Sequence, residues 1–140
     1  MQVKVIKKSE KTACQCEVIQ LNEVPQPASD LEAIPKWIEE GISVLVPTRF
    51  SSVTCQIDEN SRIRLEACYG NSIIFAFKEG FDSIQIPDLG VENLYWDSVE
   101  SAGAARNAIV KVFDSVPEDF LVVFSVPEEE FEIWDGVMTF

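Results

Sequence analysis

Apolar and polar residues alternate through residues 53–86 in the way that an antiparallel β-meander requires. Turn-forming pairs such as Glu79-Gly80 separate the apolar runs, and short loops at these points would set the strand register. We expect four strands, at Val53–Ile57, Arg62–Cys68, Ser72–Lys78 and Asp82–Ile86. Their shared core face would carry Val53, Cys55, Ile63, Leu65, Ala67, Ile73, Phe75, Phe77, Ile84 and Ile86.

One long helix is predicted at about residues 97–114, where apolar residues recur at helical spacing. Asp97 or Ser98 can cap its first turn, and the helix dipole favours an acidic residue such as Glu100 there. A shorter helix is expected at about residues 31–40, because Pro35 suits a first turn and a glycine follows.

Further strands are expected on both sides of these elements. Residues 2–7 and 12–21 alternate like two paired strands, which predicts an N-terminal hairpin. Residues 42–46 form a short apolar run, and the nearly continuous apolar run 120–126 predicts a central strand covered on both faces. Residues 128–135 alternate again and predict a C-terminal strand.

These elements together predict an α+β fold. A mainly antiparallel sheet of about six to eight strands would pack against the long helix. The length of 140 residues suits a single domain over residues 1–140.

The net charge of −13 opposes nucleic-acid binding, which needs basic residues to neutralise phosphates, and it opposes adsorption to anionic membranes. Residues 112–140 carry eight acidic residues and no basic one. A solvated face explains this asymmetry, and so does a docking surface for a basic protein. In the docking hypothesis the partner would contact Glu128, Glu129, Glu130, Glu132 and Asp135.

A second candidate surface contains Arg62 and Arg64, two of the four arginines of the chain, followed by Glu66. In the predicted meander these three side chains lie on the outer face of one strand. Cross-strand ion pairing explains them, and the alternative is a face that recognises anions or pairs two subunits.

The sequence offers little for catalysis. It contains no histidine, which excludes His-dependent triads and His-based metal sites, and it has no glycine-rich phosphate loop. The four cysteines lack the spacing of a zinc site and suit reduced thiols in a cytosolic protein. We therefore expect a cytoplasmic, non-catalytic protein without a metal or cofactor.

The first hypothesis for function is a binding protein whose acidic C-terminal region engages a basic protein partner, as an inhibitor, immunity or accessory protein would. The alternative is a small-molecule binder with an apolar pocket between sheet and helix. A homodimer formed through the arginine-bearing face is a third hypothesis. The pocket would be lined by Tyr69, Phe75, Phe77, Tyr95 and Trp96.

Overall fold

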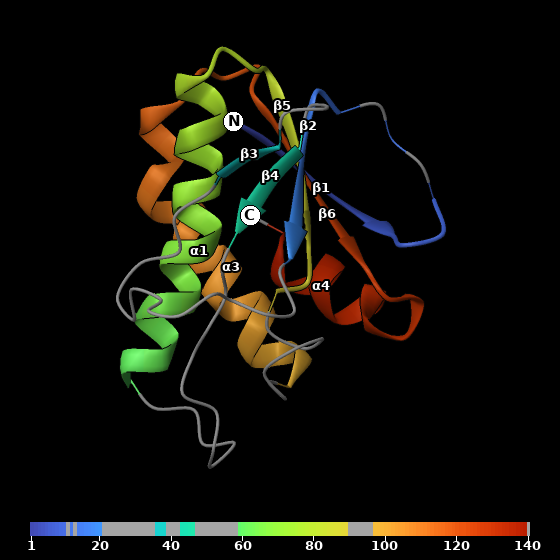
Figure 1. Ribbon diagram of the computed structural model, residues 1–140. Helices are drawn as coiled ribbons and strands as arrows, with labels where there is room; N and C mark the ends of the chain where they lie inside the picture. The colour runs from blue at the N-terminus through green and yellow to red at the C-terminus, as the bar shows by residue number, and fades with distance from the viewer. Residues whose placement is uncertain are drawn as a thin grey trace.

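A computed structural model of the chain has a six-stranded β-sheet with helices packed against it (Figure 1). The structure describes residues 1–10, 12, 14–20, 36–38, 43–46, 59–89 and 97–139. Within this part of the chain the strands are β1 (Gln2–Lys7), β2 (Cys16–Gln20), β3 (Lys36–Ile38), β4 (Ser43–Val46), β5 (Ser83–Pro87) and β6 (Leu121–Val126). The helices there are α1 (Glu59–Lys78), α3 (Ser98–Val112) and α4 (Phe131–Val137), with short 3-10 segments at Phe113–Ser115 and Glu128–Glu130.

The sheet is mainly parallel. Its strands lie in the order β1-β6-β5-β2-β4-β3, and β3, at one edge, is the strand that pairs antiparallel to its neighbour. In the central pair, Ile84 of β5 lies beside Val122 of β6, and Ile86 lies beside Phe124. The predicted α+β fold with a mainly antiparallel sheet is therefore wrong, and the protein has an α/β fold. Parallel neighbours need crossover connections, and α1 and α3 occur in the segments that precede β5 and β6.

The largest error of the sequence interpretation concerns α1. Two predicted strands, Arg62–Cys68 and Ser72–Lys78, lie in one continuous helix. The predicted strand Val53–Ile57 lies outside the described residues. The helix buries side chains at a period of 3.6 residues, whereas Ile63 and Phe77 of the predicted core face are 53% and 37% exposed. The buried positions on α1, among those whose burial the structure describes, are Leu65, Cys68, Tyr69, Gly70, Ser72, Ile73 and Ala76.

Both ends of the chain also differ from expectation. The strands β1 and β2 form no hairpin, because β1 pairs with β6 and β2 pairs with β4 and β5. Residues 128–135 form a 3-10 turn and α4 instead of a strand. In α4 the buried or half-buried Phe131, Trp134 and Val137 recur at helical spacing, which buries them on one face of α4.

The predicted short helix over residues 31–40 is wrong where the structure describes it. Lys36–Ile38 form β3, which pairs with β4 through Trp37 opposite Val44. Sheet pairing at this edge outweighs the local helix signals of the sequence. The remaining residues of that prediction lie outside the described residues.

Several predicted elements are confirmed, among them the strands predicted at residues 2–7, 12–21 and 82–86, which correspond to β1, β2 and β5. The long helix is α3, and the Asp97 side chain caps it. The short apolar run is β4, and the continuous apolar run is β6, which lies between β1 and β5. Residues 122–126 are all buried, as expected of a strand covered on both faces.

The helices α1 and α3 run in the same direction along one face of the sheet (Figure 1). They approach closely at Gly70, where an added Cβ would lie 3.5 Å from Val112 and 3.8 Å from Ala108. On the same face, the Trp134 ring of α4 packs against Phe124 of β6 and Tyr69 of α1, with centroids 5.2 and 6.2 Å away. Three helices therefore meet over the end of the sheet. No helix in the described part of the chain is long and apolar enough to cross a membrane.

Candidate functional site

The parallel strands end together at one edge of the sheet, and several polar residues follow them there. Asp88 and Leu89 come directly after β5, Glu128–Glu130 follow β6, and Asp97 and Ser98 begin α3. We call these residues the carboxyl edge. In open parallel sheets ligands bind in the crevice outside the carboxyl ends of the strands, so this edge is the candidate site.

Asp88 is a fully buried residue at the centre of the carboxyl edge. Its Oδ1 accepts a hydrogen bond of 2.7 Å from Ser101 Oγ of α3, and its Oδ2 accepts one of 3.0 Å from Trp134 Nε1 of α4. A buried carboxylate is tolerated only when donors of this kind compensate for its lost hydration. One side chain therefore ties the end of β5 to two helices.

Tyr69 of α1 extends this network. The backbone N–H of Leu89 donates to Tyr69 Oη over 3.0 Å, and Tyr69 Oη lies 3.1 Å from Ser101 Oγ. Because the single hydroxyl proton of Ser101 goes to Asp88, Tyr69 must be the donor to Ser101. Burial, followed by the negative charge of Asp88, raises the pKa of Tyr69 well above its usual range, so the phenol stays protonated.

The first turn of α3 presents a second feature. Asp97 Oδ1 accepts from the backbone N–H groups of Val99 and Glu100 at 2.7 and 3.2 Å, so the capping carboxylate already satisfies these donors. The Ser98 residue is only 8% exposed, and its Oγ has no hydrogen-bond partner among the residues that the structure describes. A buried hydroxyl without a partner is uncommon and calls for an explanation.

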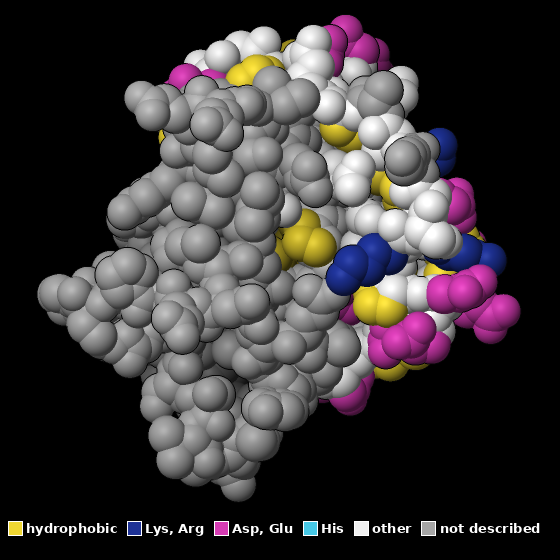
Figure 2. Space-filling view, turned by 45° about the vertical axis from the view of Figure 1, so that its right-hand side comes forward, with side chains coloured by type: hydrophobic (Ala, Val, Ile, Leu, Met, Phe, Trp, Pro, Cys, Tyr) yellow, Lys and Arg dark blue, Asp and Glu magenta, His cyan; other side chains and the backbone are white. Residues whose placement is uncertain are grey.

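Negative charge gathers at this edge. Burial, and then the charges of Asp88, Glu129 and Asp97, raise the pKa of Glu130 above its usual value. Lys7, at the end of β1, lies 3.7 Å from the carboxylate of Glu128. Figure 2 shows acidic side chains beside basic ones on the side of the molecule where β1, β6 and α4 lie. Within the described residues, no cluster of His, Cys, Asp or Glu side chains is arranged to hold a metal ion.

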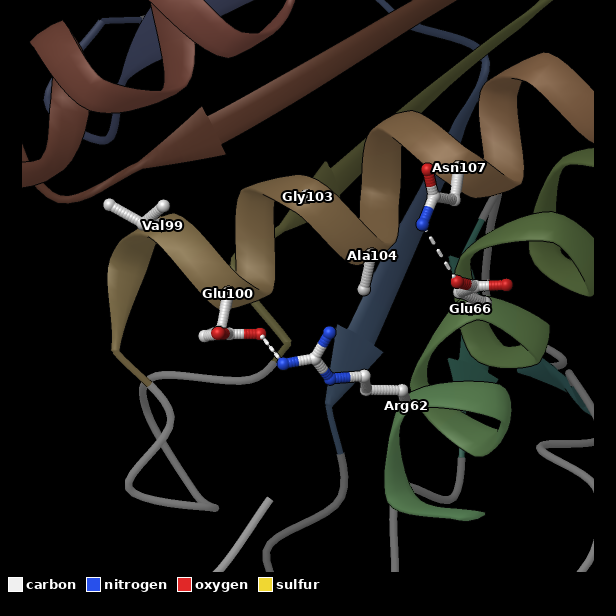
Figure 3. Close-up of a pocket in the computed structure, with 7 residues that line it drawn as sticks. All are labelled: Arg62, Glu66, Val99, Glu100, Gly103, Ala104 and Asn107. Carbon is white, nitrogen blue, oxygen red and sulfur yellow. Dashed lines mark hydrogen bonds and ion pairs between the residues drawn. The ribbon is translucent and has the colours of Figure 1, made fainter. Parts of the chain in front are cut away.

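A separate groove of about 150 Å³ lies between α1 and α3 (Figure 3). Arg62 and Glu100 form an ion pair of 2.6 Å across it, and Glu66 accepts from Asn107 at 2.9 Å and from Lys111 at 2.7 Å. Ligand pockets usually enclose roughly 300–1,000 Å³. The groove is therefore smaller than a usual ligand pocket and is lined largely by paired polar side chains. We regard the carboxyl edge as the stronger candidate for a binding site.

The structure separates the predicted partner-binding residues. Arg62, Arg64 and Glu66 lie on α1 and not on the outer face of a sheet, and Arg62 and Glu66 line the groove. Glu128–Glu130 lie at the carboxyl edge, whereas Glu132 and Asp135 are exposed residues of α4. Binding of a basic protein by the acidic residues stays a prediction, and so does a role of Arg62, Arg64 and Glu66 in anion recognition or subunit pairing.

Of the predicted pocket residues, Tyr69 reaches the candidate site, as part of the polar network. Phe75 is half-buried, and Phe77 packs edge-to-face on Phe120 with centroids 6.2 Å apart. Tyr95 and Trp96 lie outside the described residues. The sequence interpretation missed Asp88, Ser101 and Trp134, although an aspartate placed directly after an apolar strand is a recognisable signal of a strand-end site.

Comparison with known proteins supports the α/β architecture. No protein-family model matches the sequence, and no match was found among curated proteins. Among solved structures, the macro domain of ganglioside induced differentiation associated protein 2 aligns with a TM-score of 0.69 and 14% identity. That alignment covers 98% of this chain and 82% of the other.

Two macrodomain structures from Oceanobacillus iheyensis, one with MES bound and one with ADP, each align with a TM-score of 0.58 and 16% identity. Each alignment covers 70% of this chain, which spans only 50% of the matched one. Similarity at this level of identity establishes the fold, which is a macrodomain-like α/β fold.

Proposed function

We propose that this protein binds a small molecule at the carboxyl edge, and that the ligand presents hydroxyl or amino groups to it. The observation that carries the proposal is the convergence of Asp88, Leu89 and the first turn of α3 at the end of β5. This is where open parallel sheets bind their ligands.

The chemistry of the edge favours a ligand that donates hydrogen bonds. The ionised carboxylates of Asp97 and Glu130 accept hydrogen bonds but cannot donate them. The Ser98 hydroxyl can both donate and accept. A ligand hydroxyl that bonded Ser98 would satisfy a group that has no partner among the described residues. The sugar hydroxyls of a nucleoside fit these requirements.

The comparisons point toward the same class of ligand. Oceanobacillus iheyensis macrodomains of similar fold were crystallised with ADP and with MES, which are both small molecules. They favour the small-molecule alternative over the acidic docking surface expected from the sequence. Adenosine and ADP are therefore the first probes to use.

Titration of the purified protein with adenosine and with ADP, followed by calorimetry and by amide NMR, tests the proposal. We expect saturable binding with shifts at the amides of Leu89, Ser98 and Val99. Shifts confined to Arg62 and Asn107 would place the site in the groove between α1 and α3. That result, or the absence of any shift and any heat with both probes, would contradict the proposal.

A further inference from the structure

Asp88 divides its two carboxylate oxygens between two helices that are far apart in the chain. Oδ1 accepts from Ser101 in α3, and Oδ2 accepts from Trp134 in α4, 46 positions beyond Asp88. Because both bonds end on one rigid side chain, a shift of the turn after β5 would change its contacts with both helices.

The C-terminal helix contributes one deeply buried group to this arrangement. Trp134 is 0% exposed, and apart from its N–H bond to Asp88 its ring packs on Phe124 and Tyr69. The neighbouring Ile133 is 37% exposed, so Trp134 is the side chain by which α4 reaches the network. The docking of α4 is therefore linked directly to the end of β5.

An apolar side chain would fill the position of Asp88 without the cost of burying a carboxylate. Replacing buried charged groups by well-packed apolar ones is often neutral or stabilising. A buried polar network, once every member is satisfied, fixes one arrangement of its elements. Here the element that is fixed is the turn that begins with Asp88 and Leu89.

We infer that Asp88 is the positioning residue of the carboxyl edge and that it couples the turn after β5 to the docking of α4. The inference rests on the proposed function in assigning ligand binding to this edge. Ligand binding at the turn then tightens α4, and loosening of α4 weakens ligand binding by the same factor, because coupling between two sites is reciprocal.

The Trp134→Phe variant tests the coupling without any ligand. It keeps an aromatic side chain and removes the N–H that Asp88 Oδ2 accepts. It also replaces the buried indole by a smaller ring, so amides outside the network are needed to separate the loss of packing from the loss of the hydrogen bond. In hydrogen exchange of the full chain, we expect the Leu89 amide and the amides of α4 to exchange about tenfold faster or more, as loss of a hydrogen bond to a charged group predicts. Amides of Ile109 and Val123 report global stability, and Ile133→Ala is the matched control on α4.

A selective increase at Leu89 and α4 supports the coupling. An equal increase in exchange at Leu89, α4, Ile109 and Val123, or no change at Leu89, overturns it.

The Asp88→Asn variant gives a second test if Trp134→Phe does not fold. The asparagine amide oxygen can still accept a hydrogen bond from Trp134, whereas Asp88→Ala removes every acceptor at this position. The exchange rate of the Leu89 amide should therefore rise less in Asp88→Asn than in Asp88→Ala. A rise as large as that of Asp88→Ala would count against the coupling.

The ligand arm separates this inference from the proposed function. Adenosine and ADP should shift the indole N–H resonance of Trp134, which is identified by its loss in Trp134→Phe, and that variant should bind about tenfold more weakly. If neither probe binds the wild-type protein, the proposed function fails while the exchange comparison still decides the coupling. If the probes bind but Trp134→Phe binds equally well, the coupling fails and the proposed function stands.

Discussion

The hydroxyl of Tyr69 donates a hydrogen bond to Ser101 Oγ over 3.1 Å and thereby joins α1 to α3 inside the core. The same hydroxyl accepts from the backbone of Leu89, so one phenol oxygen links two helices and the end of β5. Each member of this chain of bonds therefore depends on the position of the next.

Tyr69→Phe should destabilise the protein by about 1–3 kcal/mol, because it leaves the Leu89 N–H without its acceptor in a buried site. The phenylalanine ring can keep the edge-to-face contacts with Phe124 and Trp134, so the loss reports the hydroxyl alone. Urea denaturation of both proteins measures the difference. Equal free energies of unfolding would show that the hydroxyl contributes nothing.

Stability should also fall at high pH. The pKa of Tyr69 is raised in the folded protein, so from about pH 10 upward the unfolded chain loses a proton that the folded protein keeps. The free energy of unfolding should then decrease by about 1.4 kcal/mol per pH unit from this group. Burial raises the pKa of the Cys68 thiol in the same direction, and that contribution is present in wild type and Tyr69→Phe alike.

Denaturation of the two proteins between pH 8 and about pH 11 isolates the tyrosine. The slope above about pH 10 should be shallower in Tyr69→Phe than in wild type. Two parallel profiles would mean that Tyr69 ionises equally easily in the folded and unfolded states.

The fold was predictable where one hydrophobic period fits. In α3 and β6 the apolar residues follow a single pattern, and both elements are confirmed. In α1 two patterns coincide, because Leu65 and Ile73 are buried both in the predicted strands and in the helix. Tyr69 and Ala76 distinguish the two patterns. In the predicted meander Tyr69 lies in a loop and Ala76 lies on the solvent-exposed face, whereas the helix of the structure buries both side chains.

The candidate site was harder to predict. The sequence suggests Tyr69 as a lining residue of an apolar pocket, but no pattern in it indicates the polar partners of this side chain. Ser101 lies 32 positions away along the chain, and only the crossover of parallel strands brings it to Tyr69. A sequence placed in an antiparallel meander has no common strand edge at which such residues could meet.

Ser98→Ala should separate stability from binding. Its buried Oγ lacks a partner among the described residues, so removing the hydroxyl should leave the free energy of unfolding unchanged or raise it. If a ligand hydroxyl bonds Ser98, the same change should weaken adenosine binding by about 0.5–1.5 kcal/mol. Ser115→Ala, at an exposed serine, is the matched control. If Ser98→Ala binds adenosine as tightly as wild type does, the Ser98 hydroxyl does not contact the ligand.

Glu130→Gln should raise the thermal midpoint at low salt, because it removes a carboxylate whose pKa is raised by burial and then by neighbouring negative charges. The gain should shrink as salt increases, since salt screens the repulsion. The same variant should favour ADP relative to adenosine, because one negative charge near the ligand is lost. Glu132→Gln removes an exposed charge from the first turn of α4 and is the control. Equal effects of both variants would point to net charge alone.

Gly103→Ala distinguishes the groove from the carboxyl edge. Gly103 lies within α3 and lines the groove, and an added Cβ there would meet no atom within 4 Å. Alanine restricts the unfolded chain and suits a helix better than glycine, so we expect a gain of about 0.5–1 kcal/mol in the free energy of unfolding. The methyl group fills part of the groove but leaves Ser98 and Asp88 untouched. Adenosine and ADP should therefore bind Gly103→Ala as tightly as they bind wild type. A loss of binding in this stabilised variant would instead indicate that the ligand binds in the groove between α1 and α3 and not at the end of β5.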